Sequence, residues 1–246
     1  MDLPLESLEL TLIKKLLKKH ELLTKNYLEV GCGDGLNLEC FSKLGMRGEG
    51  LDLSPDAVRL ARAKNLPGVT INQGDFLETT KKDSGLILML NVLEHVADDL
   101  AFFRQASSLL PAGGYLIIAI PANSKAFRFA DRNAGHLRRY DRQELKSKLA
   151  EAGFAIEEWL DVGFPTNRFY TWLFNWLKRN QAVTKSDLDQ TLASGIRHHE
   201  AYYGGIFDAL AKIAFPILKI IIQIDRLFVH TKLGNNFIVL ARKSTS

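Results

Sequence analysis

Cysteine is scarce in this sequence of 246 residues, which contains only Cys32 and Cys40. Two neighbouring cysteines do not make a disulfide framework, and no cysteine or histidine pairs have the spacing of a zinc site. Both absences are typical of a reducing compartment, so we expect a cytoplasmic protein.

Long apolar runs are also few. The most apolar stretch, residues 213–224, contains Pro216 and Lys219 and is too short for a membrane span. Residues 1–6 lack a basic start followed by an apolar run, so a cleaved secretory signal is not expected. The net charge of +4 fits an anionic ligand or surface but is not the concentrated charge of a nucleic-acid binder. We therefore expect no nucleic-acid partner.

Strand and helix patterns alternate over the first 160 residues. The expected strands cover residues 27–30, 49–53, 69–73, 86–90, 115–120, 154–162 and 236–241. Leucines at helical spacing predict an amphipathic helix at the N-terminus, and further helices are expected over residues 36–44, from Ser54, over 98–110 and from Asp141 to near Gly153. Ser54 is expected as an N-cap and Asp141 as the start of a capping box. This alternation predicts an α/β domain with a mainly parallel, doubly wound sheet.

Glycine and polar residues follow the expected strands in order. Gly31 and Gly33 follow the first strand, Asp52 ends the second, Asp75 follows the third and Asn91 follows the fourth. Ligands of open α/β sheets bind beyond the carboxyl ends of the strands. Glycines let the backbone approach a ligand, and an aspartate at the end of the second strand can accept hydrogen bonds from a ribose diol. These residues, in this order along the chain, predict a nucleotide-like cofactor at the carboxyl ends of the strands.

Three further residues belong to the same expected cofactor site. Glu29 places a carboxylate where an ammonium group could sit, Leu53 adjoins Asp52, and Phe76 offers apolar cover beside Asp75. An aspartate after the third strand can also accept a hydrogen bond from an adenine amino group.

These motifs resemble those of class I S-adenosylmethionine (SAM)-dependent methyltransferases. The resemblance rests on the glycine motif at 28–35, the strand end at 50–54, Gly74-Asp75-Phe76, and the segments 91–96 and 110–115. It implies a seven-stranded sheet whose last strand is antiparallel, and SAM as the cofactor. It also implies that Gly31 and Gly33 approach the methionine part of SAM, Asp52 the ribose and Asp75 the adenine. A nicotinamide-dependent dehydrogenase is a weaker alternative, since the loop lacks the G-x-G-x-x-G spacing.

His95, His136 and Tyr140 are the candidate catalytic residues. His95 lies just after the fourth strand, while His136 and Tyr140 lie in a His-x-Arg-x-Tyr segment that resembles small-molecule methyltransferases. Each histidine is a candidate base, with a structural role as the alternative; for Tyr140 the alternative is ordering of its loop. Some ubiquinone-pathway methyltransferases hold a divalent metal through Glu-x-x-Glu-His. Here Asn91 replaces the first glutamate, so no required metal is expected.

The domain is expected to span 1–246, with a helical insert over 165–232 between the last two strands. The insert is rich in aromatic and apolar residues. Three roles are open for the insert. The first two are a subdomain packed on the sheet and a homodimer contact. The third role is a lid or lipid interface over the acceptor, with peripheral membrane contact through 207–228.

The sequence thus predicts methyl transfer to O or N of a small, apolar or lipid-linked acceptor. The alternatives are an RNA or protein methyltransferase and a non-catalytic SAM-binding module.

Overall fold

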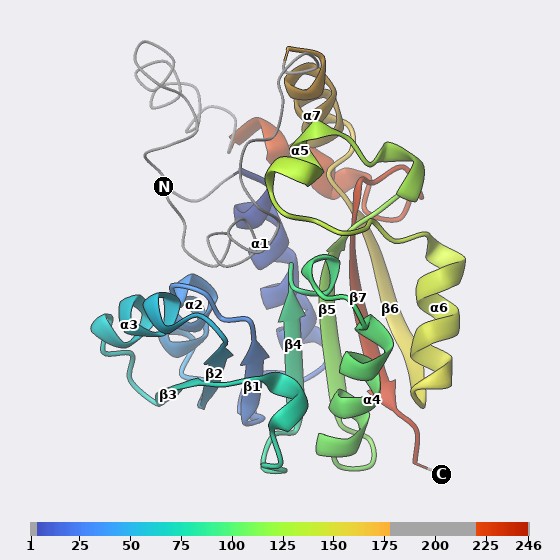
Figure 1. Ribbon diagram of the computed structural model, residues 1–246. Coiled ribbons are helices and arrows are strands. Elements are labelled where there is room, and N and C mark those ends of the chain that lie inside the picture. Colours follow the sequence, from blue (N-terminus) through green and yellow to red (C-terminus); the bar gives the residue numbers. More distant parts are fainter. Residues whose placement is uncertain (1–3, 178–219, 246) are drawn as a thin grey trace.

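The computed structural model describes residues 4–177 and 220–245 (Figure 1). Strands are β1 Tyr27–Val30, β2 Gly48–Asp52, β3 Val69–Gln73, β4 Leu86–Leu90, β5 Tyr115–Pro121, β6 Phe154–Val162 and β7 Asn236–Lys243. Helices are α1 Pro4–Lys19, α2 Leu36–Lys43, α3 Pro55–Ala63, α4 Asp99–Leu109, α5 Phe129–Asn133, α6 Arg142–Glu151 and α7 Thr166–Leu177. Short 3-10 turns include η2 Phe76–Glu78, η3 Leu93–His95 and η5 Ile222–Leu227.

The described strands form a seven-stranded sheet with the order β3-β2-β1-β4-β5-β7-β6. β1 to β5 are parallel, and β7 runs antiparallel to both β5 and β6. The predicted sheet, with its antiparallel last strand, is therefore confirmed. The strand order reverses direction between β1 and β4, and ligands of such sheets bind in the crevice at this point.

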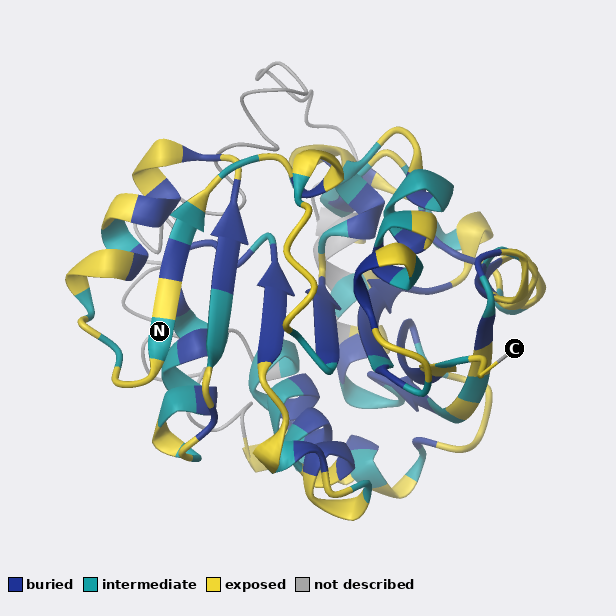
Figure 2. Cartoon of the chain, turned by 90° about the horizontal axis from the view of Figure 1, so that it is seen from below, coloured by how far each residue is buried: buried dark blue, intermediate teal, exposed yellow. Residues whose placement is uncertain are grey.

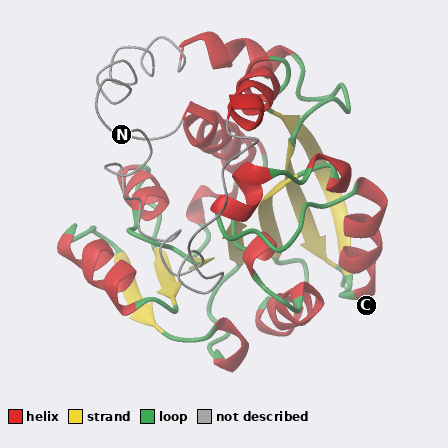
Figure 3. Ribbon diagram, turned by 45° about the horizontal axis from the view of Figure 1, so that its top comes forward, coloured by secondary structure: helices red, strands yellow, loops and turns green. Residues whose placement is uncertain are grey.

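Helices cover both faces of the sheet, as Figure 3 shows. Leucines of α1 pack with α2 and α3 on one face, and Phe103 of α4 and Leu145 of α6 pack on the other. β4 is buried along its whole length, which explains its continuous apolar sequence (Figure 2). The two cores hold the parallel strands rigidly, so their carboxyl ends form a fixed edge for a site.

Two local predictions differ from the structure. The second strand begins at Gly48 and ends at Asp52, one residue earlier than predicted, and leaves Leu53 exposed. Ser54 caps α3 as expected, since its hydroxyl accepts from the Ala57 N–H at 3.3 Å. Asp141 precedes α6 but makes no capping bond; its carboxylate accepts instead from the backbone and hydroxyl of Ser124. The predicted capping box is wrong because a long-range partner competes for this carboxylate.

The expected insert begins and ends in helical structure. α7 follows β6, η5 precedes β7, and residues 178–219, with most of the predicted insert, lie outside the described residues. The predicted membrane contact over 207–228 is therefore described only from residue 220. The bounds 165–232 stay a prediction. Among the described helices, none has the length and apolar character needed to cross a bilayer.

Candidate functional site

The loop after β1 is shaped by glycines with positive φ. Gly31, Gly33 and Gly35 have φ values of 66°, 55° and 78°. A Cβ atom on Gly31 would lie 2.6 Å from Cγ2 of Val92, the second residue after β4. The loop therefore passes close to the end of β4 at the switch point of the sheet, and only glycine fits there. This cradle is the feature that a bound nucleotide-like cofactor requires.

Asp52 fixes this loop from the end of β2. Its carboxylate accepts from the backbone N–H of Gly33 at 2.7 Å and from that of Ser54 at 2.9 Å. Each carboxylate oxygen has a second lone pair, so the oxygens can still accept from a ribose diol. The adjacent Leu53 side chain is 61% exposed, which leaves an apolar surface beside the carboxylate.

The residues after β3 divide into a surface aspartate and a core phenylalanine. Asp75 is exposed and accepts from the Leu77 N–H at 2.9 Å, so it caps the turn η2. The Phe76 ring is buried and packs on Phe102, with ring centroids 5.3 Å apart. The Phe76 ring thus belongs to the core beneath α4, and its contact with the cofactor stays a prediction.

Glu29 lies beneath the glycine loop at the buried end of β1. Its side chain is 1% exposed and accepts from the Asn37 amide of α2 at 2.8 Å. A buried carboxylate at the switch point is a suitable partner for an ammonium group. Asn37, which sequence reasoning missed, orients this carboxylate.

Asn91 follows β4 and contacts a buried carboxylate from the N-terminal helix. Its φ is 57°, and its amide donates to Glu9 Oε2 at 3.3 Å. The Asn236 amide, at the start of β7, donates to the other oxygen of Glu9 at 2.8 Å. Burial raises the pKa of Glu9 to about 7, while the two amides oppose the shift. Glu9 thus joins α1 to the site edge.

Sequence reasoning missed Glu9, although a signal was present. Glu9 is four residues after Leu5 and three before Leu12, so it falls on the apolar stripe of α1. A glutamate on a stripe that packs against a sheet needs polar partners inside the protein. The two asparagines at the sheet edge supply them.

The loop 131–140 lies over the segment that follows β4. The Leu137 N–H donates to the Glu94 carbonyl at 2.7 Å, and His95 Nδ1 lies 3.2 Å from the Gly135 carbonyl oxygen. The rings of His95 and His136 meet edge to face, with centroids 4.9 Å apart. The structure therefore brings the two predicted histidines together, although 40 residues separate the segments that hold them.

His136 is oriented by a buried aspartate. Its Nδ1 lies 3.1 Å from Asp131 Oδ1, and its Nε2 lies 4.0 Å from Glu94 Oε1. Arg139 donates to the same Asp131 oxygen at 2.7 Å. Hydrogen bonds from His136 and Arg139 outweigh burial and lower the pKa of Asp131, so this carboxylate is ionised at neutral pH. Asp131 was not identified from the sequence.

The neighbouring ionisable groups are perturbed in different directions. Burial raises the pKa of Glu94 to about 7. Burial, with the nearby His136, lowers the pKa of His95 to about 4, so His95 is neutral at physiological pH. A cluster with such perturbed groups at a sheet edge is typical of a reaction site.

Tyr140 has a different position from the one predicted. Its side chain is fully buried, and its hydroxyl contacts the Leu93 carbonyl oxygen at 2.9 Å and the Asp99 carboxylate at 2.8 Å. Burial and Asp99 raise the pKa of the hydroxyl. Tyr140 therefore orders the loop and the turn after β4, and its catalytic role stays a prediction.

Glu94, His95 and His136 also have the geometry of a cation site. One ligand atom from each lies within 4.8 Å of the others. Both Nδ1 atoms already contact protein oxygens, which is the arrangement found behind metal-bound imidazoles. Two imidazoles and a carboxylate suit zinc or another first-row divalent ion. The expectation that no metal is required stays a prediction.

Comparisons with known proteins agree with this geometry. A family model described as a methyltransferase domain matches residues 7–158. A Mycolicibacterium smegmatis protein named "Probable S-adenosylmethionine-dependent methyltransferase" is 30% identical over 148 residues, 58% of this chain and 57% of that protein. A ubiquinone biosynthesis O-methyltransferase of Xanthomonas euvesicatoria is 31% identical over 122 residues, 47% and 51% of the two chains. The structure of an S-adenosylmethionine-dependent methyltransferase from Mesorhizobium loti has a TM-score of 0.55 at 17% identity, covering 89% and 91%.

The doubly wound sheet, the glycine cradle and the acidic strand ends define a class I methyltransferase fold. Since the family model covers more than half of the sequence, the chain belongs to the methyltransferase domain family, whose class I members use SAM. The matched segments span about half the length of these two curated relatives. The Mesorhizobium loti structure, at its low identity, shows the fold alone.

Proposed function

We propose that the protein transfers the methyl group of SAM to an O or N atom of a small, apolar or lipid-linked acceptor. Bound SAM supplies an electrophilic methyl group. Gly31 and Gly33 would hold its methionine part, Asp52 its ribose and Asp75 its adenine. The fit rests on the cradle after β1, where a Cβ would clash, and on the Asp52 carboxylate aimed into that loop.

The single observation that carries the reaction is the His136–Asp131 pair beside Glu94. Asp131 holds Nδ1 of His136 at 3.1 Å and leaves Nε2 directed to the Glu94 side, at the carboxyl edge of β4. A histidine oriented in this way can accept a proton on Nε2 from an acceptor hydroxyl or ammonium group. Alignment of the acceptor supplies the rest of the rate enhancement.

The acceptor class is inferred from the apolar surface near this edge and from relatives named as ubiquinone biosynthesis O-methyltransferases. Both support an apolar acceptor, and neither supports a nucleic-acid substrate. A salt-dependent affinity for RNA that exceeds the affinity for apolar acceptors would contradict this proposal.

Calorimetric titration with SAM tests the cofactor part of the proposal. Wild-type protein is expected to bind SAM, and Asp52→Ala to weaken binding at least about tenfold, because a charge-assisted bond contributes roughly 1.5–3 kcal/mol. Asp56→Ala, an exposed aspartate of the next helix, is the matched control and is expected to bind like wild type. A folded wild-type protein that does not bind SAM would contradict the proposal.

A further inference from the structure

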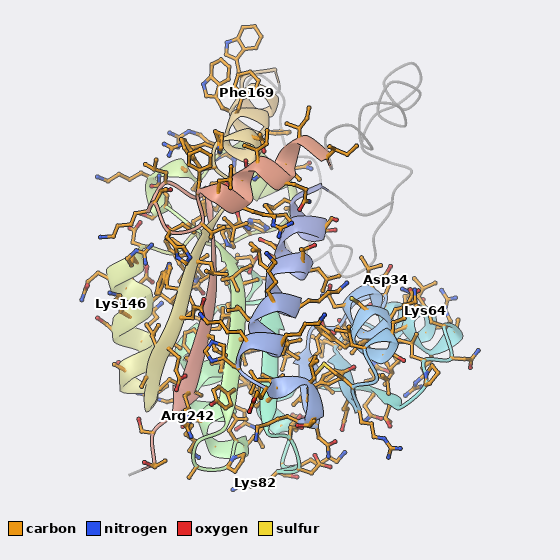
Figure 4. All side chains as sticks on the ribbon, turned by 180° about the vertical axis from the view of Figure 1, so that it is seen from behind. Asp34, Lys64, Lys82, Lys146, Phe169 and Arg242 are labelled. Atoms are coloured by element: carbon orange, nitrogen blue, oxygen red, sulfur yellow. The ribbon has the colours of Figure 1, made fainter. Side chains whose placement is uncertain are left out.

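Large apolar side chains are exposed at one end of the molecule. Phe169, Trp172 and Trp176 of α7 are 63%, 60% and 52% exposed. On and beside η5, Ile224 and Leu227 are 48% and 80% exposed. Figure 4 shows Phe169 at the outer end of the molecule, pointing away from the sheet. Elsewhere among the described residues exposed apolar side chains such as Leu53 and Leu77 stand singly, so this group of them indicates a contact surface.

The surface is held in a fixed position by buried polar contacts. The Asp225 carboxylate of η5 accepts from the Thr166 N–H at 2.9 Å, the Thr166 hydroxyl at 2.7 Å and the Asn167 N–H at 3.3 Å. Asp225 is fully buried and therefore joins the start of α7 to η5. Ile222, on the inner side of η5, belongs to the core beneath α1. The exposed residues thus project from a rigid base.

The exposed charge around this surface is mainly positive. Described residues 122–141, 163–177 and 220–235 contain three acids: Asp131 and Asp225 are buried, and the exposed Asp141 accepts hydrogen bonds from Ser124. The other exposed charged residues of these stretches are basic: Lys125, Arg128, Arg132, Arg168 and Lys232. α5, which carries Arg132, contacts α7, and Arg168 precedes Phe169 within α7. Aromatic residues surrounded by basic ones complement an anionic lipid surface.

We propose that α5, α7 and η5 form a membrane-binding face that inserts Phe169, Trp172 and Trp176 among the headgroups of an anionic bilayer. The occupant is a lipid surface because the exposed charge is mainly positive, with five basic residues against Asp141; two copies of such a face would repel one another. The inference rests on the proposed apolar acceptor, since the face lies on the same end of the molecule as the carboxyl edge of the sheet (Figure 1).

Flotation of the full chain with lipid vesicles tests the face without SAM. Binding is expected to vesicles that contain phosphatidylglycerol and not to vesicles of phosphatidylcholine alone, and to weaken as salt rises. Trp172→Ala with Trp176→Ala is expected to reduce the partition coefficient at least about tenfold. Leu77→Ala, which removes an exposed apolar side chain at a distant turn, is expected to have no effect.

Charge reversal provides the second pair of variants. Arg132→Glu with Lys232→Glu is expected to abolish binding, while Lys82→Glu with Lys146→Glu is expected to leave it unchanged. Both pairs alter the net charge equally, and Figure 4 shows Lys82 and Lys146 away from Phe169. Three results would overturn the proposal. The first is an equal loss of vesicle binding in both pairs of variants. The others are equal binding of wild type to neutral and anionic vesicles, and no vesicle binding by folded wild-type protein.

Fluorescence separates a bilayer contact from a dimer contact. In a Trp159→Phe background the remaining tryptophans are Trp172 and Trp176, and their emission is expected to shift to the blue when anionic vesicles are added. A shift that follows protein concentration in the absence of vesicles would assign the face to a second copy of the chain and overturn the proposal. Because neither assay uses SAM, failure here is distinct from failure of the proposed methyl transfer.

Discussion

His136 and Asp131 show how a single hydrogen bond sets the chemistry of a side chain. The ionised Asp131 accepts from Nδ1 of His136, so Nε2 is the ring nitrogen that can offer a lone pair. The same lone pair serves a base or a metal ligand, and the Glu94 carboxylate beside it suits both roles. A general base needs no metal ion from solution, whereas a metal ligand does. Treatment with a chelator therefore distinguishes the two mechanisms.

We expect His136→Gln to lower kcat about 100-fold, because a general base contributes roughly this factor, and to leave SAM affinity unchanged. Wild-type protein treated with a chelator is expected to keep its activity, since the base needs no ion. His230→Gln, an exposed histidine, is the control and should turn over normally. Loss of activity on chelation, restored by zinc or manganese, would assign Glu94, His95 and His136 to a metal site instead.

Individual site residues were predictable where the backbone pattern alone places them. Gly31 and Asp52 follow from strand ends, because parallel strands bring their carboxyl ends to one edge. Asp131 and Asn37 were missed because their partners, His136 and Glu29, become neighbours only through folding. The buried position of Tyr140 could not be predicted either, because its partner Asp99 lies 41 residues away in the sequence.

At the scale of the element, α7 depends on a capping group from another segment. Asp225 accepts from the first two backbone N–H groups of α7, which a helix cannot satisfy by itself. No periodicity in the sequence of α7 reveals this, because 58 residues separate Asp225 from Asn167. Strands were predicted more closely than this cap. The apolar run of β4 indicates a buried strand from its own residues, whereas the group that caps α7 lies in another segment.

Asp225→Ala is expected to lower the free energy of unfolding by about 2–3 kcal/mol, because it leaves buried N–H donors without an acceptor. Urea denaturation measures the change. Asp225→Asn keeps one acceptor oxygen and is expected to recover part of the loss. Asp83→Ala removes an exposed aspartate from an ion pair with Lys81 and should cost little. Unfolding of Asp225→Ala at the wild-type urea concentration would exclude a capping role.

At the scale of the whole molecule, buried carboxyl groups couple stability to pH. The pKa of Glu9 is about 7 in the folded state against an ordinary value of 4.5, so between these values the folded protein binds a proton that the unfolded chain releases. Folded stability therefore falls as pH rises through this window. Glu6 and Glu94, which face Glu9 and repel its charge, act in the same direction on its pKa. His95, whose pKa is lowered to about 4, opposes the trend.

Comparison of variants isolates the contribution of Glu9. Glu9→Gln cannot ionise, so its stability relative to wild type is expected to improve by roughly 3 kcal/mol between pH 5 and pH 8. Thermal or urea unfolding at both pH values measures the difference. Glu78→Gln, an exposed glutamate, should show no such change. A constant difference between Glu9→Gln and wild type at both pH values would show that Glu9 does not titrate in this range.

The hairpin of β6 and β7 has a consequence for how such enzymes diversify. The Asp161 N–H donates to the Val229 carbonyl at 2.7 Å and the Asn235 N–H to the Val162 carbonyl at 2.9 Å, so the chain leaves and re-enters the sheet at adjacent points. The length and composition of a segment anchored in this way can change without shifting the register of β6 and β7. The segment between β6 and β7 can therefore change while the strand ends that carry the glycine loop and Asp52 stay in place.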